Sequence, residues 1–298
     1  LGCMSFGDGE PWMLKGDDAE AVIERAIDLG INFFDTANAY SGGESERVLG
    51  DALAGYDRDE QVVATKVFFP TEDGHNRSGL SRKTIEQELD ASLDRLGMDC
   101  IDLYQIHRWD DDTPIETTMR ALDDAVRRGK VRYLGASSMW AHQFADALHT
   151  SDELGLERFA TMQNHYNLVY REEEREMNPL CERENVGLVP WSPLAGGYLA
   201  RPHEEGESMR ERTMERYDSP QAREINERTA ELADEAGVSM AQIGLAWQLH
   251  KGVAAPIYGT TSVEHLEDAV EAVELDLSDG DVEYLEEPYE PQPVSGHE

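Results

Sequence analysis

Short apolar runs alternate with longer segments of helical periodicity along the whole chain. Each run is followed by turn or capping residues, a pattern typical of repeated βα units. Strands are predicted at residues 2–5, 32–34, 62–66, 101–106, 131–135, 161–163, 187–191 and 255–257. Helices are predicted at residues 18–29, 44–53, 81–96, 114–128, 141–154, 171–184, 223–236 and 240–250.

The order of these elements predicts an α/β fold of one class. About eight strands with no linker rich in Pro, Gly or Ser favour a single (β/α)8 TIM barrel domain over residues 1–298 rather than an open doubly wound sheet. No GxGxxG motif follows the first strand, so a Rossmann phosphate loop is not indicated. A long loop, Pro193 to Pro220, follows the seventh strand, and an extra helix is expected near the C-terminus.

Charge is the unusual feature of the composition. The 298 residues include 62 acidic and 26 basic side chains, a formal net charge of −36, and the acidic residues are spread along the chain. Such self-repulsion becomes tolerable in molar salt, where the Debye length is about 3 Å, so we expect a high-salt cytosol. The alternative, binding of cations or basic partners, needs clustered charge. Nucleic-acid binding is disfavoured because no basic patch is visible.

The three cysteines are odd in number, far apart and outside any CxxC pattern, which indicates buried or inert thiols in a reducing compartment. They are Cys3, Cys100 and Cys181. No run of about 18 apolar residues and no signal peptide is recognisable, so we expect a soluble cytoplasmic protein without a membrane partner.

Four ionisable side chains follow or end three consecutive predicted strands. They are Asp35 and Tyr40 after the second strand, Lys66 at the end of "QVVATK", and His107 at the end of "CIDLYQIH". In a barrel of this kind chemistry gathers at the C-terminal ends of the strands. Each residue alone has another interpretation: Asp35 as a cap, Tyr40 as packing, Lys66 as a surface residue and His107 as a core histidine.

Together the four residues predict a proton donor for a forming alkoxide. Lys66 beside Asp35 would form a buried ion pair, and buried charges persist when they are paired. A tyrosine with a pKa of about 10 can donate a proton at neutral pH, and a nearby ammonium favours its phenolate. His107 could polarise a carbonyl oxygen. No metal site is predicted, because one His and one Asp are too few ligands for zinc.

These motifs resemble those of the aldo-keto reductase superfamily over essentially the full chain. "FFDTANAYSGGESERVLGDAL" is similar to the segment that carries the catalytic Asp and Tyr, "ATKV" to the lysine segment and "IDLYQIHR" to the histidine segment. The resemblance implies a catalytic tetrad of Asp35, Tyr40, Lys66 and His107. It also implies a nicotinamide dinucleotide bound across the barrel mouth without a Rossmann loop.

The same resemblance implies a set of cofactor contacts. The segments "LGCM", "LGASSMW", "MQNHYN", "PWSPLAGGYL" and "PIYGTTSVEHLEDAVEAV" are similar to those that bind the nicotinamide, carboxamide, pyrophosphate and adenosine. Trp191 stands where a ring stacks on the nicotinamide. The implied contacts are Gly2, Cys3, Met4, Asp35, Ser137, Ser138, Gln163, Trp191, Ser192, Pro193, Leu194, Gly196, Gly259, Thr260, Thr261, Ser262, His265 and Asp268.

Two departures from the family pattern matter. Many relatives place Lys or Arg in the adenosine segment to hold the 2'-phosphate of NADP, but residues 259–263 contain no basic residue. NADP(H) is therefore favoured by the resemblance alone, NAD(H) stays open, and His265 and Arg201 are the candidate substitutes. The family's short hairpin before the first strand has no counterpart, which we interpret as truncation of the chain.

The predicted function is NAD(P)H-dependent reduction of aldehydes or ketones to alcohols, with Tyr40 as the proton donor and a small-molecule carbonyl substrate. One alternative is a regulatory barrel that resembles channel β-subunits and binds cofactor with little turnover. Another is a metal-dependent barrel hydrolase, which the lack of clustered ligands disfavours. Four aromatic residues after strand ends could form an apolar substrate pocket, although packing is an equal alternative for each: Trp12, Phe68, Trp109 and Trp140.

Overall fold

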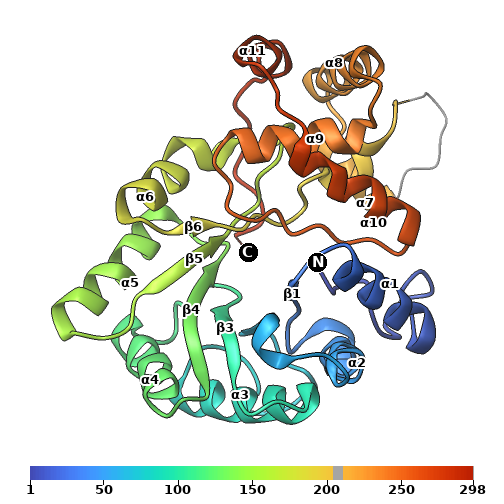
Figure 1. Ribbon diagram of the computed structural model, residues 1–298. Helices are drawn as coiled ribbons and strands as arrows, with labels where there is room; N and C mark the ends of the chain where they lie inside the picture. The colour runs from blue at the N-terminus through green and yellow to red at the C-terminus, as the bar shows by residue number, and fades with distance from the viewer. Residues whose placement is uncertain (204–210, 298) are drawn as a thin grey trace.

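A parallel sheet of six strands curls through the centre of the molecule, with its strands in chain order (Figure 1). The computed structural model describes residues 1–203 and 211–297. The strands are β1 (Phe33–Asp35), β2 (Val62–Val67), β3 (Ile101–Ile106), β4 (Val131–Ser137), β5 (Phe159–Gln163) and β6 (Gly187–Leu188). Because every pair is parallel, the carboxyl ends of all six strands point to one end of the sheet.

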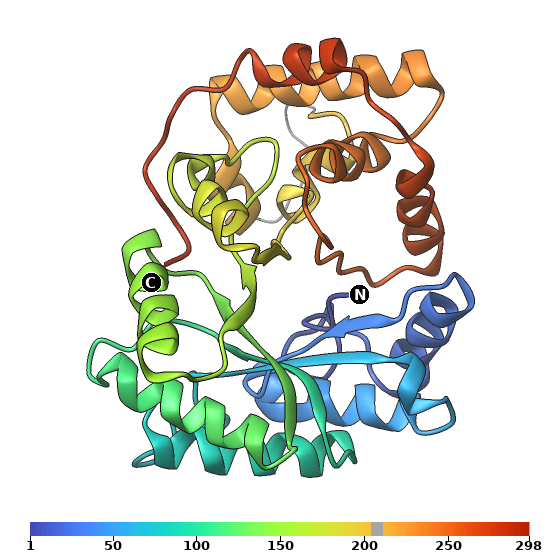
Figure 2. The ribbon, with the colours of Figure 1, turned by 60° about the vertical axis from the view of Figure 1, so that its left-hand side comes forward.

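Helices cover the outside of this sheet. Figures 1 and 2 show α1 to α6 around its convex face, with α8 and α11 packed further out beyond α9. The helices are α1 (Gly16–Asp28), α2 (Glu44–Leu53), α3 (Arg82–Leu96), α4 (Ile115–Arg127), α5 (Ala141–Leu154), α6 (Met177–Glu184), α7 (Glu211–Tyr217), α8 (Pro220–Ala236), α9 (Met240–His250), α10 (Val263–Val270) and α11 (Asp279–Glu286). Short 3-10 helices are η1 (Tyr40–Gly43), η2 (Arg58–Glu60), η3 (Glu172–Arg175), η4 (Ala195–Ala200) and η5 (Glu271–Glu274).

Two of the eight predicted strands are not regular strands among the described residues. Residues 2–5 contribute a single bridge between Gly2 and Asp35, and residues 255–257 contribute one between Ile257 and Trp191. The backbone N–H of Gly2 also donates to the carbonyl of Tyr258 at 2.8 Å. The two segments therefore lie side by side between β1 and β6, but their pairing is too short to count as strands.

The predicted strand at residues 187–191 is also shorter as a regular strand. β6 ends at Leu188, but hydrogen bonds to the β5 side continue beyond it: Val189 N donates to Met162 O at 3.0 Å and Trp191 N donates to Asn164 O at 2.9 Å. Because alternate residues donate to one neighbour in a parallel ladder, Pro190 does not remove a hydrogen bond to β5. Trp191 therefore lies at the carboxyl end of the sheet, just beyond the regular strand, with isolated bridges to His165 and Ile257.

The region predicted as one long loop, Pro193 to Pro220, contains helical structure in its described parts. η4 occupies its beginning and α7 its end. Residues 204–210 of the predicted loop lie outside the described residues. α11 is a helix in the C-terminal region, where the sequence predicts an extra one, whereas α10 is not expected from the periodicity.

Helix ends follow capping chemistry. α3 begins after Ser81, whose hydroxyl accepts from Thr84 N, and ends at Gly97 in the left-handed region with φ 64°. The predicted helix 171–184 is divided in two, since Glu176 leaves helical geometry between η3 and α6. Pro179 is accommodated in the first turn of α6, where backbone N–H groups have no helical partner.

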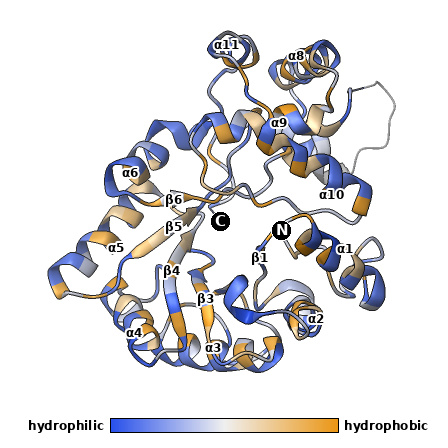
Figure 3. Ribbon diagram, viewed as in Figure 1, coloured by the Kyte–Doolittle hydropathy of each residue, from blue (hydrophilic) through white to orange (hydrophobic). Residues whose placement is uncertain are grey.

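Successive side chains of a strand point to opposite faces of the sheet, so outward-facing residues pack against the helices and inward-facing residues line the interior of the sheet. Tyr104 of β3 points outward, where its hydroxyl donates to the carbonyl of Ile85 in α3. Lys66 and Gln105, which are register partners on β2 and β3, point inward. Figure 3 shows hydrophobic residues along β3 and β4 and largely hydrophilic outer helices. Within the described residues, no helix combines the length and apolar character needed to span a membrane.

Candidate active site

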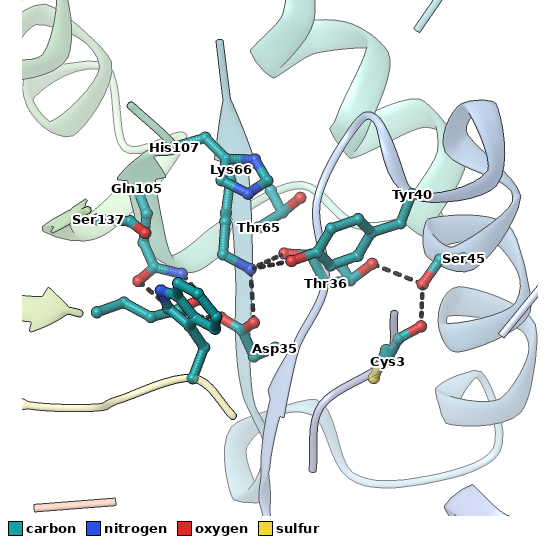
Figure 4. Close-up of polar contacts among 12 residues, drawn as sticks. Cys3, Asp35, Thr36, Tyr40, Ser45, Thr65, Lys66, Gln105, His107 and Ser137 are labelled. Atoms are coloured by element: carbon teal, nitrogen blue, oxygen red, sulfur yellow. Dashed lines mark hydrogen bonds and ion pairs between the residues drawn. The ribbon is translucent and has the colours of Figure 1, made fainter. Parts of the chain in front are cut away.

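The segment that follows β1 brings Asp35 and Tyr40 to the carboxyl end of the sheet. Asp35 is the last residue of β1 and is buried. The turn to α2 is fixed by a short chain of hydroxyls, in which Thr36 Oγ1 lies 2.8 Å from Ser45 Oγ, which donates to the carbonyl of Cys3 at 2.7 Å. Figure 4 shows the Tyr40 ring after this turn, with its hydroxyl next to the Lys66 amino group.

The amino group of Lys66 joins these two residues. Its Nζ lies 2.5 Å from Asp35 Oδ1, 2.9 Å from the carbonyl of Thr36 and 3.2 Å from the hydroxyl of Tyr40. Three acceptors match the three donors of an ammonium. The ion pair that the sequence predicts between Asp35 and Lys66 is therefore present, and its hydrogen bonds offset the cost of burying a side chain with no exposed surface.

Burial reverses one electrostatic expectation. Loss of solvent raises the pKa of Tyr40, and although the Lys66 ammonium acts in the opposite direction, the net shift is upward. Burial also lowers the pKa of Lys66, but Asp35 and Tyr40 outweigh it and the pKa of Lys66 is raised. The site at neutral pH therefore holds a charged lysine beside a protonated tyrosine.

His107 faces the same space from the end of β3. Its ring packs edge-on to Tyr40, with ring centres 5.8 Å apart, and edge-on to Phe69 at 5.0 Å. Burial lowers the pKa of His107 well below its ordinary value, and the charges of Lys66 and Arg108 act in the same direction. His107 is therefore neutral at pH 7. Its buried Nδ1 has no hydrogen-bond partner within the described residues.

Two glutamines complete the surroundings of Asp35. Gln105 Nε2 donates to Asp35 Oδ2 at 2.9 Å, and Gln163 Nε2 donates to the same oxygen at 2.8 Å. Sequence reasoning selects Gln163 only for the cofactor and misses Gln105, because it considers residues at strand ends. The signal that could find Gln105 is the two-residue alternation of β3, which places it on the same face as His107.

The structure places the predicted nicotinamide and carboxamide residues near each other but pairs them among themselves. Trp191 Nε1 donates to Ser138 Oγ at 2.9 Å, and Ser138 Oγ lies 3.2 Å from Ser137 Oγ. The ring of His165 stacks on the Trp191 ring, with ring centres 4.1 Å apart. His165 and Arg216, whose Cζ lies 5.4 Å from the centre of the Trp191 ring, are not singled out by the sequence motifs.

The turn after Trp191 is open backbone of the kind that an anion can approach. Ser192, Ala195, Gly196 and Gly197 all have positive φ, and a Cβ at Gly197 would meet no atom within 4 Å. Pro193 and Leu194 lie between them in the same turn. Backbone concavities of this kind can bind phosphate groups, so the segment is compatible with the pyrophosphate contact that the family resemblance implies.

The first and last predicted cofactor segments adjoin each other. Gly2 N donates to Tyr258 O, Gly259 lies beside Gly2, Cys3 is buried and Met4 is half exposed. Residues 260–265 form the capped start of α10: Ser262 N donates to Thr260 Oγ1, and His265 N donates to Ser262 Oγ. Thr261 and His265 are exposed. Asp268 accepts a hydrogen bond from Ser239 Oγ at 2.6 Å, so it supports the start of α9.

The four aromatic residues predicted for a substrate pocket differ in burial and in the neighbours that the structure shows for them. Phe68 packs edge-on to Phe69 at 5.0 Å, and it is Phe69 that contacts His107. Trp140 is 45% exposed and edge-on to His297 at 4.7 Å. Trp12 and Trp109 are partly buried, and Trp109 packs against the core.

The fold and the site together define a parallel α/β protein in which buried Asp, Lys and His side chains converge with a partly buried Tyr at the carboxyl ends of the strands. The sequence model of the aldo/keto reductase family matches residues 1–290, and the chain belongs to this family. The chain is 43% identical to aldo-keto reductase AMT2 of Alternaria alternata, over 100% of this chain and 89% of that protein. It is 41% identical to versiconal hemiacetal acetate reductase of Aspergillus parasiticus, over 99% and 94% respectively.

Membership of this family defines the general chemistry. The family acts on small-molecule substrates and typically uses nicotinamide cofactors, and membership supports an oxidoreductase activity that reduces carbonyl groups. His107 Nδ1, which has no hydrogen-bond partner in the described part of the chain, and the open backbone at Gly197 fit such a ligand, because one offers a polar contact and the other offers backbone for phosphate.

Proposed function

We propose that the protein reduces aldehyde or ketone groups to alcohols with NAD(P)H, using Tyr40 as the proton donor. The observation that carries this proposal is the position of Lys66 Nζ, which bridges Asp35 at 2.5 Å and the Tyr40 hydroxyl at 3.2 Å. A protonated tyrosine with a fixed ammonium beside it is poised to lose its proton, since the resulting phenolate is paired at once.

When bound, a reduced nicotinamide supplies the hydride that becomes the new C–H bond. The carbonyl oxygen then takes the proton of Tyr40, and the C=O double bond becomes a C–OH single bond. Lys66 stabilises the phenolate that remains, Asp35 keeps Lys66 in place, and Tyr40 regains a proton from solvent. His107 orients the carbonyl oxygen as a neutral imidazole and not as a charged imidazolium.

The cofactor residues are proposed in three groups. Ser137, Ser138 and Gln163 would hold the carboxamide beside the Trp191 ring, and the turn from Ser192 to Gly196 would hold the pyrophosphate. The segments 2–4 and 259–268 would contact the nicotinamide and the adenosine. The open turn and the exposed Thr261 and His265 support these assignments. NADP(H) is favoured by the family resemblance, although no basic residue lies at positions 259–263.

We also propose that the six-stranded sheet is part of a closed (β/α)8 barrel that forms one domain. The bridges at Gly2 and Ile257 and the hydrogen bond between Gly2 and Tyr258 support closure between β1 and β6. A closed barrel would bring the residues after Trp191 and those before α10 to the same mouth as the four ionisable residues.

Replacing Tyr40 with Phe tests the proposed reaction. The variant keeps the ring against His107 but lacks the transferable proton, so reduction of a panel of aldehydes and ketones should fall by about 10²–10⁴-fold. Fluorescence titrations with NADPH and with NADH measure cofactor binding, and the dissociation constants of the variant should stay within about threefold of those of the parent. Comparison of the two titrations of the parent gives its cofactor preference.

The matched control is Tyr133→Phe, which removes the hydroxyl of an exposed tyrosine on β4 and should leave turnover unchanged. Undiminished carbonyl reduction in Tyr40→Phe would overturn the assignment of the proton donor. Tight cofactor binding by the parent chain without turnover of any carbonyl would instead favour a regulatory cofactor-binding role.

A further inference from the structure

Gln105 lies within the curled sheet next to the ionisable residues, and it has no role in the proposed reaction as described so far. Its side chain is fully buried, and its Nε2 donates to Asp35 Oδ2 at 2.9 Å. Lys66 holds the other oxygen, Oδ1, at 2.5 Å. The two oxygens of Asp35 are therefore fixed by two different strands, so the carboxylate cannot rotate without losing a charge-assisted hydrogen bond.

Gln163 closes a triangle of hydrogen bonds with these groups (Figure 4 shows the bonds around Asp35). Its Nε2 donates to Asp35 Oδ2 at 2.8 Å and lies 3.3 Å from Gln105 Oε1. If Gln163 turns to the carboxamide of a cofactor, as proposed, Asp35 Oδ2 loses this donor. Gln105 is then the only side chain of the triangle that still holds Oδ2.

The backbone around Gln105 is shaped to admit its side chain. Gly135 is the register partner of Gln105 on β4. A Cβ at Gly135 would lie 2.8 Å from Gln105 Cγ and 2.6 Å from Thr161 Oγ1, and both distances are shorter than a Cβ normally makes with any neighbouring heavy atom. The pairing of β4 with β5 also shifts register between Leu134 and Gly135. Glycine at 135 therefore keeps open the space in which Gln105 reaches Asp35.

We propose that Gln105 is a positioning residue of the active site, which fixes the Asp35 carboxylate and, through it, the Lys66 ammonium beside Tyr40. The inference rests on the proposed function, in which Tyr40 transfers the proton. A hydrogen-bond donor to a carboxylate stabilises its negative charge. Without that donor, Asp35 projects a stronger negative potential toward Tyr40, and ionisation of Tyr40 becomes harder.

Two substitutions separate the hydrogen bond from the shape of the side chain. Gln105→Met keeps the length but removes the donor, and kcat should fall about tenfold with the alkaline limb of its pH profile moved to higher pH by about one unit. Gln105→Glu keeps the shape, and its carboxyl can donate to Asp35 only when protonated. Its activity relative to the parent should therefore recover as the pH is lowered.

A second readout needs no turnover. In protein labelled with ¹³C at tyrosine Cζ, the Tyr40 resonance is assigned by its absence in Tyr40→Phe. In Gln105→Met this resonance should titrate at higher pH than in the parent. The matched control is Gln248→Met, which removes a fully buried glutamine that donates to the Tyr166 carbonyl. It should lower stability but leave the pH profile and the Tyr40 resonance unchanged.

The outcomes distinguish this inference from the proposed function. A shifted Tyr40 titration in a chain that reduces no carbonyl supports Gln105 as a positioning residue and rejects the reaction. Parent-like pH profiles and Tyr40 titrations in both Gln105 variants, in a chain that does reduce carbonyls, overturn the role of Gln105 and leave the reaction standing.

Discussion

At the residue scale, the ionisable side chains predicted singly from the sequence form one hydrogen-bonded network in the structure, in which each residue positions the next. Asp35 holds Lys66, Lys66 faces Tyr40, and Gln105 and Gln163 hold Asp35 from the other side. The sequence identifies the first three because each ends or follows a strand. It misses Gln105 because only residues at strand ends are considered. The alternation of β3 puts Gln105 on the face of His107, but that it lies beside Lys66 follows only from the register of β2 and β3.

The sign of the Tyr40 shift also depends on the structure. From the sequence, only the charge of a neighbouring lysine can be considered, and that charge favours the phenolate. The extent of burial is a property of the assembled site, and its effect on the pKa of Tyr40 is larger than that of the ammonium. A motif therefore locates the proton donor without giving its acidity.

His165 leads to a prediction about stability and pH. It is fully buried between the rings of Tyr170 and Trp191, and burial lowers its pKa to about 3. In the unfolded chain, the imidazole of His165 binds a proton below pH about 6.5, whereas in the folded chain it stays neutral down to about pH 3. Folding stability is therefore lost as the pH falls from about 6.5 toward 3. At pH 4.5 this residue should account for about 3 kcal/mol of the loss.

Urea unfolding of His165→Gln at several pH values measures this contribution. The variant should be less stable than the parent at pH 7, because Tyr217 loses its 2.8 Å hydrogen bond, but its stability should decline less steeply toward pH 4.5. His149→Gln removes an exposed histidine of α5 and should keep the slope of the parent. Equal slopes for the parent and His165→Gln would contradict the assignment.

At the element scale, regular periodicity predicts structure well and short pairings predict it poorly. The helices of the α2 to α5 region and strands β2 and β3 lie within a few residues of their predicted ranges. The first and last predicted strands shrink to single bridges, because apolar composition does not reveal how many ladder hydrogen bonds a segment will make.

The segment after α11 returns across the molecule and packs against Trp191 (Figure 2 shows the C-terminal chain beside α5). Tyr289 and Gln292 anchor it to Glu172, and Ser295 N donates to the Tyr170 hydroxyl at 2.8 Å. Gly296 then passes so close that a Cβ there would lie 2.8 Å from the Trp191 ring, at a φ of 96°. No periodicity in this segment predicts the contact.

Gly296→Ala should therefore strain the segment at both its backbone and its contact. The left-handed φ and the clash with Trp191 should lower the free energy of unfolding by about 1–3 kcal/mol or release the segment from the ring. Urea unfolding measures the first result, and a change in Trp191 fluorescence measures the second. Gly280→Ala in α11, where a Cβ meets only ordinary contacts, is the matched control. Parent-like stability and fluorescence in Gly296→Ala would contradict the packing.

At the scale of the whole molecule, the acidic surface has two opposite effects on stability: local ion pairs and repulsion among the excess carboxylates. Many of the described arginines already pair with carboxylates, as Arg82 does with Asp124 and Arg171 with Glu286. Since 62 acidic residues face 26 basic ones, at least 36 carboxylates have no basic residue left to neutralise them. Salt weakens both effects, but exposed ion pairs contribute at most about 1 kcal/mol each, so the repulsion of the excess should dominate.

Thermal unfolding in rising KCl tests this balance. The melting temperature should rise by several degrees, mostly below about 1 M, because the Debye length falls from about 10 Å at 0.1 M to about 3 Å at 1 M and the repulsion is screened over that range. The same series near pH 4.4, the isoelectric point, is the control. There the net charge is close to zero and the salt response should shrink. A flat response at pH 7 would show that the acidic surface does not limit stability, and it would remove the reason to expect a high-salt cytosol.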